Sequence, residues 1–353
     1  MLPRLLSGDF PRSPWLSGAL ALLVLVLALA PFLFSGARAM NVAATICVFV
    51  VLVASYDLLL GYTGIVSFAH TMFYGIGAYG VGLALYGIGP SWGAMLLGLA
   101  LALLLSLALA LVIGLFSLRV KAIFYAMITL AVASAFAILA SQLSDFTGGE
   151  DGRTFSVPEI LRPGFRLFEA EIFGTAINGK LLTYYLLFFA ALAIFLFLLR
   201  VVNSPFGRVL QAIRENDFRA EALGYRTVVY RTLANCLAAA TATLAGAMMA
   251  LWLRYAGPQT TLSFTIMMDI LLIVVIGGMG TLYGAMIGSA LFILAQNYLQ
   301  ALMKQASDGL TAVPVLANLL HPDRWLLWLG VFFVLSVYFF PSGIVGKLRA
   351  LKK

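Results

Sequence analysis

The chain has 353 residues, of which 63% are hydrophobic and only 10% are charged. A soluble globular protein carries about 25% charged and about 45–50% apolar residues. This composition therefore excludes a soluble domain and predicts a polytopic α-helical membrane protein. The net charge of +8 does not indicate nucleic-acid binding, because the basic residues gather at the ends of apolar segments, where the positive-inside rule places them.

Ten apolar segments approach the length of about 20 residues that crosses a bilayer. We therefore expect an all-α transmembrane bundle over residues 15–341, between an N-terminal tail (1–14) and a basic C-terminal tail (342–353). Glycines and His70 interrupt the third segment, and the eighth is short. The ten segments are 15–34, 40–60, 65–86, 92–118, 123–143, 181–202, 228–255, 264–276, 284–303 and 325–340.

The basic residues predict that both termini lie in the cytoplasm. With ten crossings, the polar segment 203–227 is then cytoplasmic, and the loops 144–180 and 304–324 lie outside. This topology requires the third segment to cross; whether it spans fully or re-enters is left open. The cytoplasmic side gathers Arg4, Arg12, Arg119, Lys121, Arg208, Arg214, Arg219, Arg226, Arg231, Lys347, Arg349, Lys352 and Lys353.

The outer loop 144–180 is dense in turn residues, which argues against a long helix. It is too short to form a domain with its own large core. Its apolar residues, among them Phe155, Val157, Ile160 and Leu161, predict that it packs on the outer face of the bundle.

Asp57 and Asp269 are the carboxylates within the apolar segments, and each precedes a glycine-rich break. An ionised acid near the bilayer centre is costly, so such a residue usually faces the bundle interior or water. An ion, proton or substrate site is one interpretation. The interpretation that we prefer for both is a residue near a helix end that forms a hydrogen bond with a neighbour.

Glycines and hydroxyl residues are concentrated in residues 61–80 and again in residues 277–284. Glycine permits both close helix packing and interrupted helices, and interrupted helices mark the binding sites of many transporters. Packing without solute contact is the alternative for each position. The candidate residues of a translocation path are Gly61, Gly64, Ser67, His70, Gly75, Gly77, Gly277, Gly278 and Gly280.

The segment 203–231 is the one long polar stretch between apolar segments on the cytoplasmic side. Its apolar residues recur at three- and four-residue intervals, which predicts a short amphipathic helix. Pro205 suits the start of this helix and Gly224 its end. The apolar stripe comprises Val209, Leu210, Ile213, Phe218, Ala222 and Leu223.

Four motifs resemble the permeases of ATP-binding-cassette (ABC) importers for branched-chain amino acids. Residues 207–225, GRVLQAIRENDFRAEALGY, resemble their cytoplasmic coupling segment. GYTGIVSFAHTMFYGIGAY at 61–79, TGGEDG at 147–152 and VIGGMGTLYGAMIGSA at 275–290 resemble their other motifs, in the order found in LivM-type members. One departure is that Glu221-Ala222-Leu223 is followed at once by Gly224, which leaves the docking residues open.

The resemblance implies an importer subunit in the inner membrane of a bacterial cell. It would pair with a LivH-type permease and two cytoplasmic ATPase subunits, and a periplasmic binding protein would deliver an amino acid. ATP would be used by the ATPase subunits, and this chain would bind no cofactor or metal and no nucleic acid, while contacting membrane lipid. The resemblance assigns ATPase coupling to Arg208, Arg214, Glu215, Asp217, Arg219, Glu221, Ala222 and Gly224.

Three alternatives remain at this point. An ion-coupled secondary transporter of a small polar solute would use Asp57, Asp269 or His70. An ABC importer for urea or short amides would share the permease but carry another solute. An enzyme is disfavoured, because no GxxxxGK[ST], HExxH, CxxC or GxSxG motif occurs in the chain.

Overall fold

The computed structural model describes residues 13–34, 36–117, 122–172, 175–309, 321–339 and 342–350. Most of the predicted N-terminal tail lies outside these residues, as do residues 310–320 of the predicted outer loop. The basic residues Arg4, Arg12, Arg119, Lys121, Lys352 and Lys353 also lie outside them.

In the described part of the chain, eight helical segments are long and apolar enough to cross a membrane, which confirms the predicted helical bundle. The remaining two predicted segments are also helical: α4 (His70–Gly87), which is less apolar, and α16 (Trp325–Phe339), which is shorter. The eight are α2 (Pro14–Leu33), α3 (Ala37–Thr63), α5 (Trp92–Ser117), α6 (Ala122–Gln142), α8 (Gly179–Val202), α11 (Thr227–Leu253), α12 with α13 (Pro258–Thr261, Phe264–Gly277) and α14 (Leu282–Gly309).

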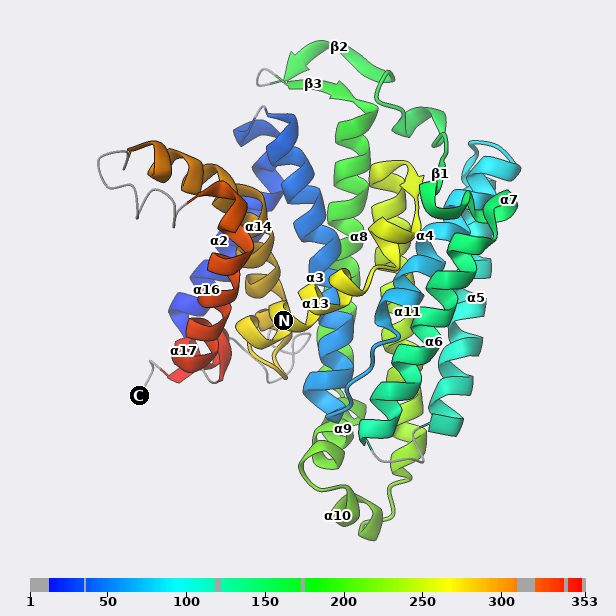
Figure 1. The fold of residues 1–353 in the computed structure, drawn as a ribbon, viewed down its shortest axis with the longest axis vertical. Coiled ribbons are helices and arrows are strands. Elements are labelled where there is room, and N and C mark those ends of the chain that lie inside the picture. Colours follow the sequence, from blue (N-terminus) through cyan, green and yellow to red (C-terminus); the bar gives the residue numbers. More distant parts are fainter. Residues whose placement is uncertain are drawn as a thin grey trace.

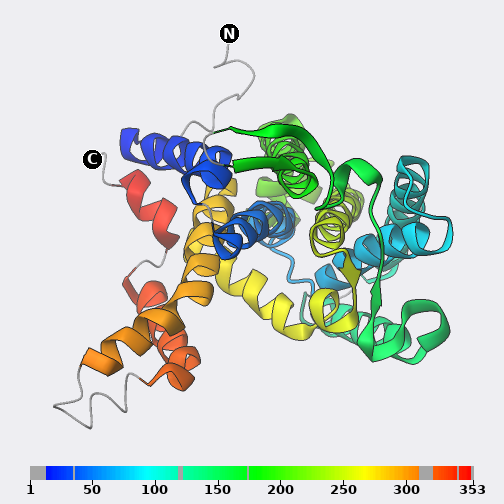
Figure 2. The same ribbon diagram turned by 90° about the horizontal axis from the view of Figure 1, so that it is seen from above.

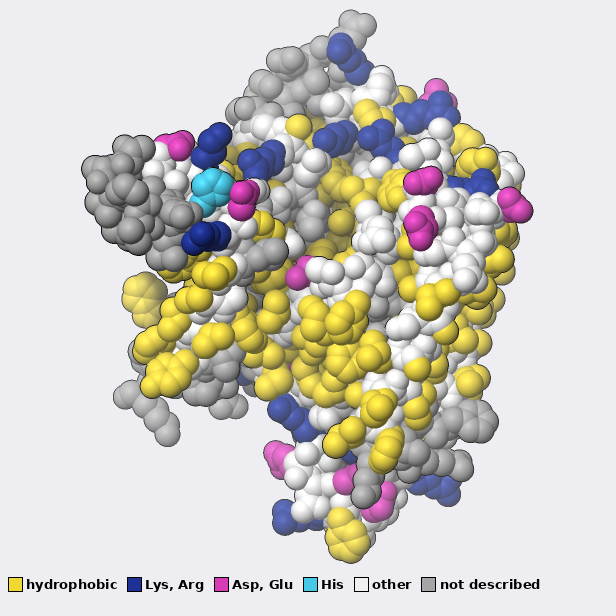
Figure 3. Space-filling view, in the orientation of Figure 1, with side chains coloured by type: hydrophobic (Ala, Val, Ile, Leu, Met, Phe, Trp, Pro, Cys, Tyr) yellow, Lys and Arg dark blue, Asp and Glu magenta, His cyan; other side chains and the backbone are white. Residues whose placement is uncertain are grey.

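Helix α3 forms the centre of the bundle, with α8, α11, α13 and α14 packed around it (Figures 1 and 2). The spanning window of α3 is 94% buried, whereas that of α6 is 17% buried. Hydrophobic side chains form a belt between two ends at which Lys and Arg gather (Figure 3). Cations therefore occupy both ends, and the cytoplasmic location of the termini stays a prediction.

Helix α4 packs between α11 and α5, where small residues permit close approach. A Cβ atom on Gly77 would overlap the Thr243 carbonyl of α11, and one on Gly246 would overlap the Tyr74 carbonyl of α4. The glycines of the third predicted segment thus bring two helix backbones together.

The third predicted segment begins with five residues that are not helical, because the chain unwinds between Gly64 and Ala69. This stretch climbs from the lower end of α3 to the start of α4 (Figure 1). Side chains satisfy its backbone: the Phe68 N–H donates to Thr129 Oγ1 at 3.0 Å, and the Ala69 N–H donates to Ser67 Oγ at 3.4 Å. Such compensation is what permits irregular backbone within a membrane bundle.

The outer loop forms short elements that pack on the bundle, as predicted. Phe155, Val157 and Leu161 are buried, whereas Ile160 is exposed. Strand β1 (Arg153–Thr154) pairs antiparallel with β4 (Tyr255–Ala256), which ties the loop to the end of α11. The other elements are α7 (Ser144–Thr147), η1 (Gly149–Asp151), η2 (Glu159–Leu161) and the antiparallel strands β2 (Arg166–Ile172) and β3 (Thr175–Asn178).

Three boundaries differ from the sequence prediction. Helix α14 continues through polar residues to Gly309, beyond the predicted end at residue 303, and η3 (Pro322–Arg324) precedes α16. Within the predicted C-terminal tail, α17 (Gly343–Ala350) packs against α13 and α14 with Val345 buried. The predicted single cytoplasmic helix is two helices, α9 (Pro205–Glu215) and α10 (Asp217–Ala222).

Candidate functional site

Helix α9 is anchored to the lower end of the bundle by its apolar side (Figure 1). It begins at Pro205, which occupies the first helical position, where a missing N–H costs nothing. Leu210 and Ile213 are buried, and the backbone of Gly207 lies against that of Val202 at the end of α8. Helix α9 therefore packs directly on the spanning helices α3, α8 and α11.

Asn216 breaks the predicted helix and starts α10. Its backbone is extended, with φ −159°, and its side-chain oxygen accepts the Arg219 N–H at 2.9 Å, an N-terminal cap. The break changes the direction of the side chains that follow. Phe218 and Leu223 are 83% and 73% exposed, so the second half of the predicted stripe points into solvent.

Two predicted coupling acids hold α10 to the start of α11. Asp217 forms an ion pair with Arg231 at 2.8 Å, and Glu221 Oε1 accepts a hydrogen bond from Thr227 Oγ1 at 2.7 Å. Helix α10 ends at Ala222, and Gly224 turns the chain away from it with a φ of +91°, in the left-handed region that favours glycine. The remaining predicted coupling residues Arg208, Glu215, Arg219 and Ala222 are exposed on α9 and α10.

Arg214 turns away from the other exposed charges of α9 and reaches the bundle. Its guanidinium donates a hydrogen bond to the carbonyl of Gly61 in the last turn of α3. It also lies against Gly64 and Gly280, where an added Cβ would stand 3.3 Å and 2.8 Å from its side chain. Helix α9 is thus joined to both glycine-rich breaks.

Asp57 lies at the same place, fully buried one turn before Gly61. Its Oδ1 accepts the N–H of Gly280 at 2.8 Å, which links α3 to the turn between α13 and α14. Gly280 has φ +81°, and its N–H comes close enough to α3 that a Cβ on Gly61 would overlap it. The hydrogen-bonding interpretation of Asp57 is confirmed.

We call Asp57, Gly61, Arg214 and Gly280 the junction. The sequence indicated Arg214 on the polar face of a helix and Asp57 in another motif. The predicted topology places Arg214, a cation, and Asp57, an acid, near the same membrane surface, and this is a sequence signal that they lie close together. However, Gly61 and Arg214 are 153 positions apart in the chain, so only the fold could bring them together.

The other predicted path residues lie at packing contacts. Ser67 and His70 are buried beside the unwound stretch, with His70 Nε2 2.7 Å from Ser55 Oγ. A Cβ on Gly75 would overlap Leu262, and Gly277 packs on Gly284. Gly278 lies next to Ser342 and the start of α17. A role of these residues in lining a path stays a prediction.

The hydrogen-bonding part of the interpretation is also confirmed for Asp269, which is less buried than Asp57. It lies in the interior of α13 and is only partly buried, and its carboxylate forms a hydrogen bond with the Gln296 side chain of α14. The described residues contain no group of three or more His, Cys, Asp or Glu that could hold a metal ion.

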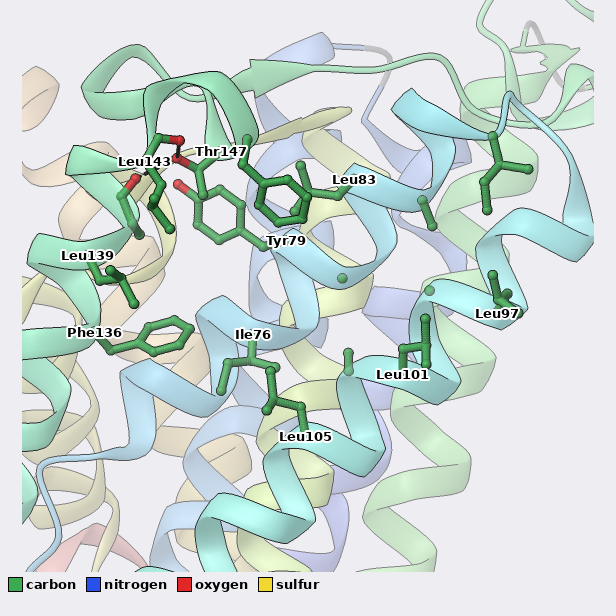
Figure 4. Close-up of a pocket in the computed structure, with 17 residues that line it drawn as sticks. Ile76, Tyr79, Leu83, Leu97, Leu101, Leu105, Phe136, Leu139, Leu143 and Thr147 are labelled. Carbon is green, nitrogen blue, oxygen red and sulfur yellow. Dashed lines mark hydrogen bonds between the residues drawn. The ribbon is translucent and has the colours of Figure 1, made fainter.

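A cleft of about 500 Å³ opens between α4, α5 and α6 (Figure 4). Ile76, Leu101, Phe136 and Leu139 point into it, and Tyr79 and Thr147 lie at its outer end. Its lining is almost entirely apolar, which suits the acyl chains of lipid rather than a polar solute.

Comparison with known proteins gives one family and several relatives. Residues 38–335 match the family described as the permease component of branched-chain amino acid transport systems. The chain is 26% identical to the high-affinity branched-chain amino acid transport system permease protein LivM of Escherichia coli, over 87% of this chain and 73% of that protein. It is 25% identical to the probable branched-chain amino acid transport permease protein LivM of Methanocaldococcus jannaschii, over 65% of this chain and 62% of that protein. It is 24% identical to the permease protein LivH of Salmonella typhimurium, over 83% of this chain and 89% of that protein. No solved structure matches the chain significantly.

Proposed function

The chain belongs to the family of permease components of branched-chain amino acid transport systems, and we propose that α9 and α10 transmit the force that drives it. It is a permease subunit of an ABC importer and a multi-pass membrane protein. We further propose that it carries branched-chain amino acids in a bacterial inner membrane. Its partners are a LivH-type permease, two ATPase subunits that use ATP, and a periplasmic binding protein.

The exposed pair Phe218 and Leu223 supports this assignment of force transmission. Large apolar side chains that are exposed among charges at the tip of an anchored helix are typical of a protein contact. The surrounding charges Arg208, Glu215 and Arg219 suit the polar rim of such a contact. We assign this tip to the ATPase subunit.

The junction supplies the route from the tip to the path. When the ATPase subunits close, α9 moves and Arg214 moves the last turn of α3 with it. Because Asp57 holds the Gly280 N–H, the turn between α13 and α14 follows α3. The two glycine-rich breaks therefore change position together, as a switch between two packed states requires.

Reconstitution tests this function. The chain is placed in liposomes with the second permease, the ATPase subunits and the binding protein, and uptake of labelled leucine is measured. Uptake should require ATP and the ATPase subunits. Uptake driven by a proton or sodium gradient without any ATPase would overturn the proposal and favour an ion-coupled secondary transporter.

A single substitution tests the tip. Phe218→Ala should lower ATP-driven uptake by about thirtyfold, because loss of a large apolar anchor typically costs about 2 kcal/mol. Leu233→Ala is the matched control, since Leu233 is 53% exposed but lies on the spanning helix α11. Equal uptake by both variants would show that Phe218 does not contribute to the contact with the ATPase subunit.

An importer for urea or short amides remains the second candidate, because it would use the same junction and tip. A binding screen on the cognate periplasmic protein separates the two. Branched-chain amino acids should bind; urea or amides binding in their place would reassign the substrate.

A further inference from the structure

Asp57 and Asp269 both lie within spanning helices, and they differ in burial and in the kind of group that they contact. Asp57 is buried at a helix end and caps the turn at Gly280. Asp269 lies in the interior of α13, is partly exposed, and has the neutral side chain of Gln296 as its hydrogen-bond partner. A carboxylate at membrane depth is costly unless it faces water, a polar path or another protein group.

The side of α13 that carries Asp269 is its open side. Met267, Ile270 and Ile273 are fully buried in the bundle. Phe264 is 53% exposed, and Thr265, Met268 and Asp269 are exposed or partly exposed on the other side. Figure 2 shows α13 between α14 and α16 on one side and α6 on the other. Asp269 therefore lies on a face that the rest of this chain covers only in part.

Helix α14 continues the polar surface toward the outer end. Gln296, Gln300 and Lys304 follow at four-residue intervals and so lie along one side of the helix. Gln300 and Lys304 are exposed. The spanning window of α14 has a mean hydropathy of 1.3, the lowest of the eight. Gln300 and Lys304 lie at the predicted outer end of the spanning segment, residue 303, so the stripe joins Gln296 to the polar region beyond that end.

We propose that the carboxylate of Asp269, oriented by Gln296, binds the ammonium group of the amino acid during its passage. A carboxylate and an ammonium group form a charge-assisted hydrogen bond, which is stronger than one between neutral groups. Gln300 and Lys304 lead from the outer end of α14 to this site. The inference rests on the proposed function, since it requires an amino acid as the solute.

The first experiment compares Asp269→Asn and Asp269→Glu in the complete reconstituted importer, with labelled leucine. The ratio of leucine transported to ATP hydrolysed should fall about tenfold or more in Asp269→Asn, because a hydrogen bond to a charged group is lost. Asp269→Glu should restore part of the ratio by restoring the charge. Glu159→Gln, which removes an exposed acid from the outer loop, is the matched control and should leave the ratio unchanged.

The second experiment measures access to the site directly. Asp269→Cys is introduced after Cys47 and Cys236, the two native cysteines, are replaced by alanine. A cationic methanethiosulfonate reagent should label the new thiol, and leucine with its binding protein and ATP should slow the labelling. A thiol that does not react, or that reacts equally fast with and without substrate, would overturn the proposal.

The two experiments also distinguish failure of the proposed function from failure of the inference about Asp269. If wild-type uptake needs no ATPase, the proposed function fails. If wild-type uptake is ATP-driven but Asp269→Asn keeps the normal ratio, only this inference fails. If Asp269→Asn no longer co-purifies with the second permease, Asp269 is a contact between the two permeases, and the substrate site is rejected.

Discussion

Gly77 lies where α4 crosses α11, and its hydrogen side chain is what allows the two backbones to meet. A Cβ there would overlap the Thr243 carbonyl, whereas one on Gly87, at the end of the same helix, would meet no atom within 4 Å. We therefore expect Gly77→Ala to destabilise the protein by about 1–3 kcal/mol through overpacking. Gly87→Ala should be neutral. Thermal unfolding in detergent compares them, and equal stability would show that α4 and α11 can separate freely.

Asp57 forms a structural hydrogen bond, so its acceptor oxygen matters more than its charge. Asp57→Asn keeps an oxygen for the Gly280 N–H, and we expect it to retain most ATP-driven uptake. Asp57→Ala leaves that N–H without its acceptor, at a cost of about 1–3 kcal/mol, and should impair uptake clearly. Initial uptake rates decide between them. Complete loss of uptake in Asp57→Asn would favour ion coupling through this carboxylate.

At the scale of elements, the shape of α9 and α10 depends on two local signals. Asn216 caps α10, and Gly224 turns the chain away from it, with the Tyr225 N–H bonded to the Ala220 carbonyl at 3.2 Å. The hydrophobic period correctly indicated helix in this segment. It did not show the break at Asn216. A cap residue in the middle of a regular apolar stripe can either continue the helix or start a new one. Packing of the first half of the segment decides between the two.

Gly224 can be tested without changing any packing contact, since a Cβ there would meet no atom within 4 Å. Its φ of +91° is unfavourable for a β-branched residue. Gly224→Val should therefore displace the tip of α10 and reduce coupled uptake several-fold, by roughly 1–2 kcal/mol of strain. Gly224→Asn should retain more uptake, because asparagine tolerates this region better. Both should insert normally into the membrane. Normal coupling in the valine variant would contradict a role of this helix end.

At the scale of the whole molecule, ten helical segments predict that both ends of the chain lie on one side. The basic residues of 203–231 predict that this side is the cytoplasmic one. A tag at either terminus should therefore be protected from protease added outside intact cells and be cleaved in inverted vesicles. Cleavage of one tag in intact cells would mean that one segment, with α4 the first candidate, does not cross.

The sequence by itself determined the class of molecule, the helical segments and the family resemblance. Apolar length and turn residues are local properties, and lipid leaves helices as the main way to satisfy the backbone. Only the tertiary structure decided what the polar residues do. Asp57 and Gly280 are 223 positions apart, so their hydrogen bond follows from packing and not from any local pattern. The same packing buries Asp57 fully and Asp269 only in part, which separates two acids that no local pattern distinguishes.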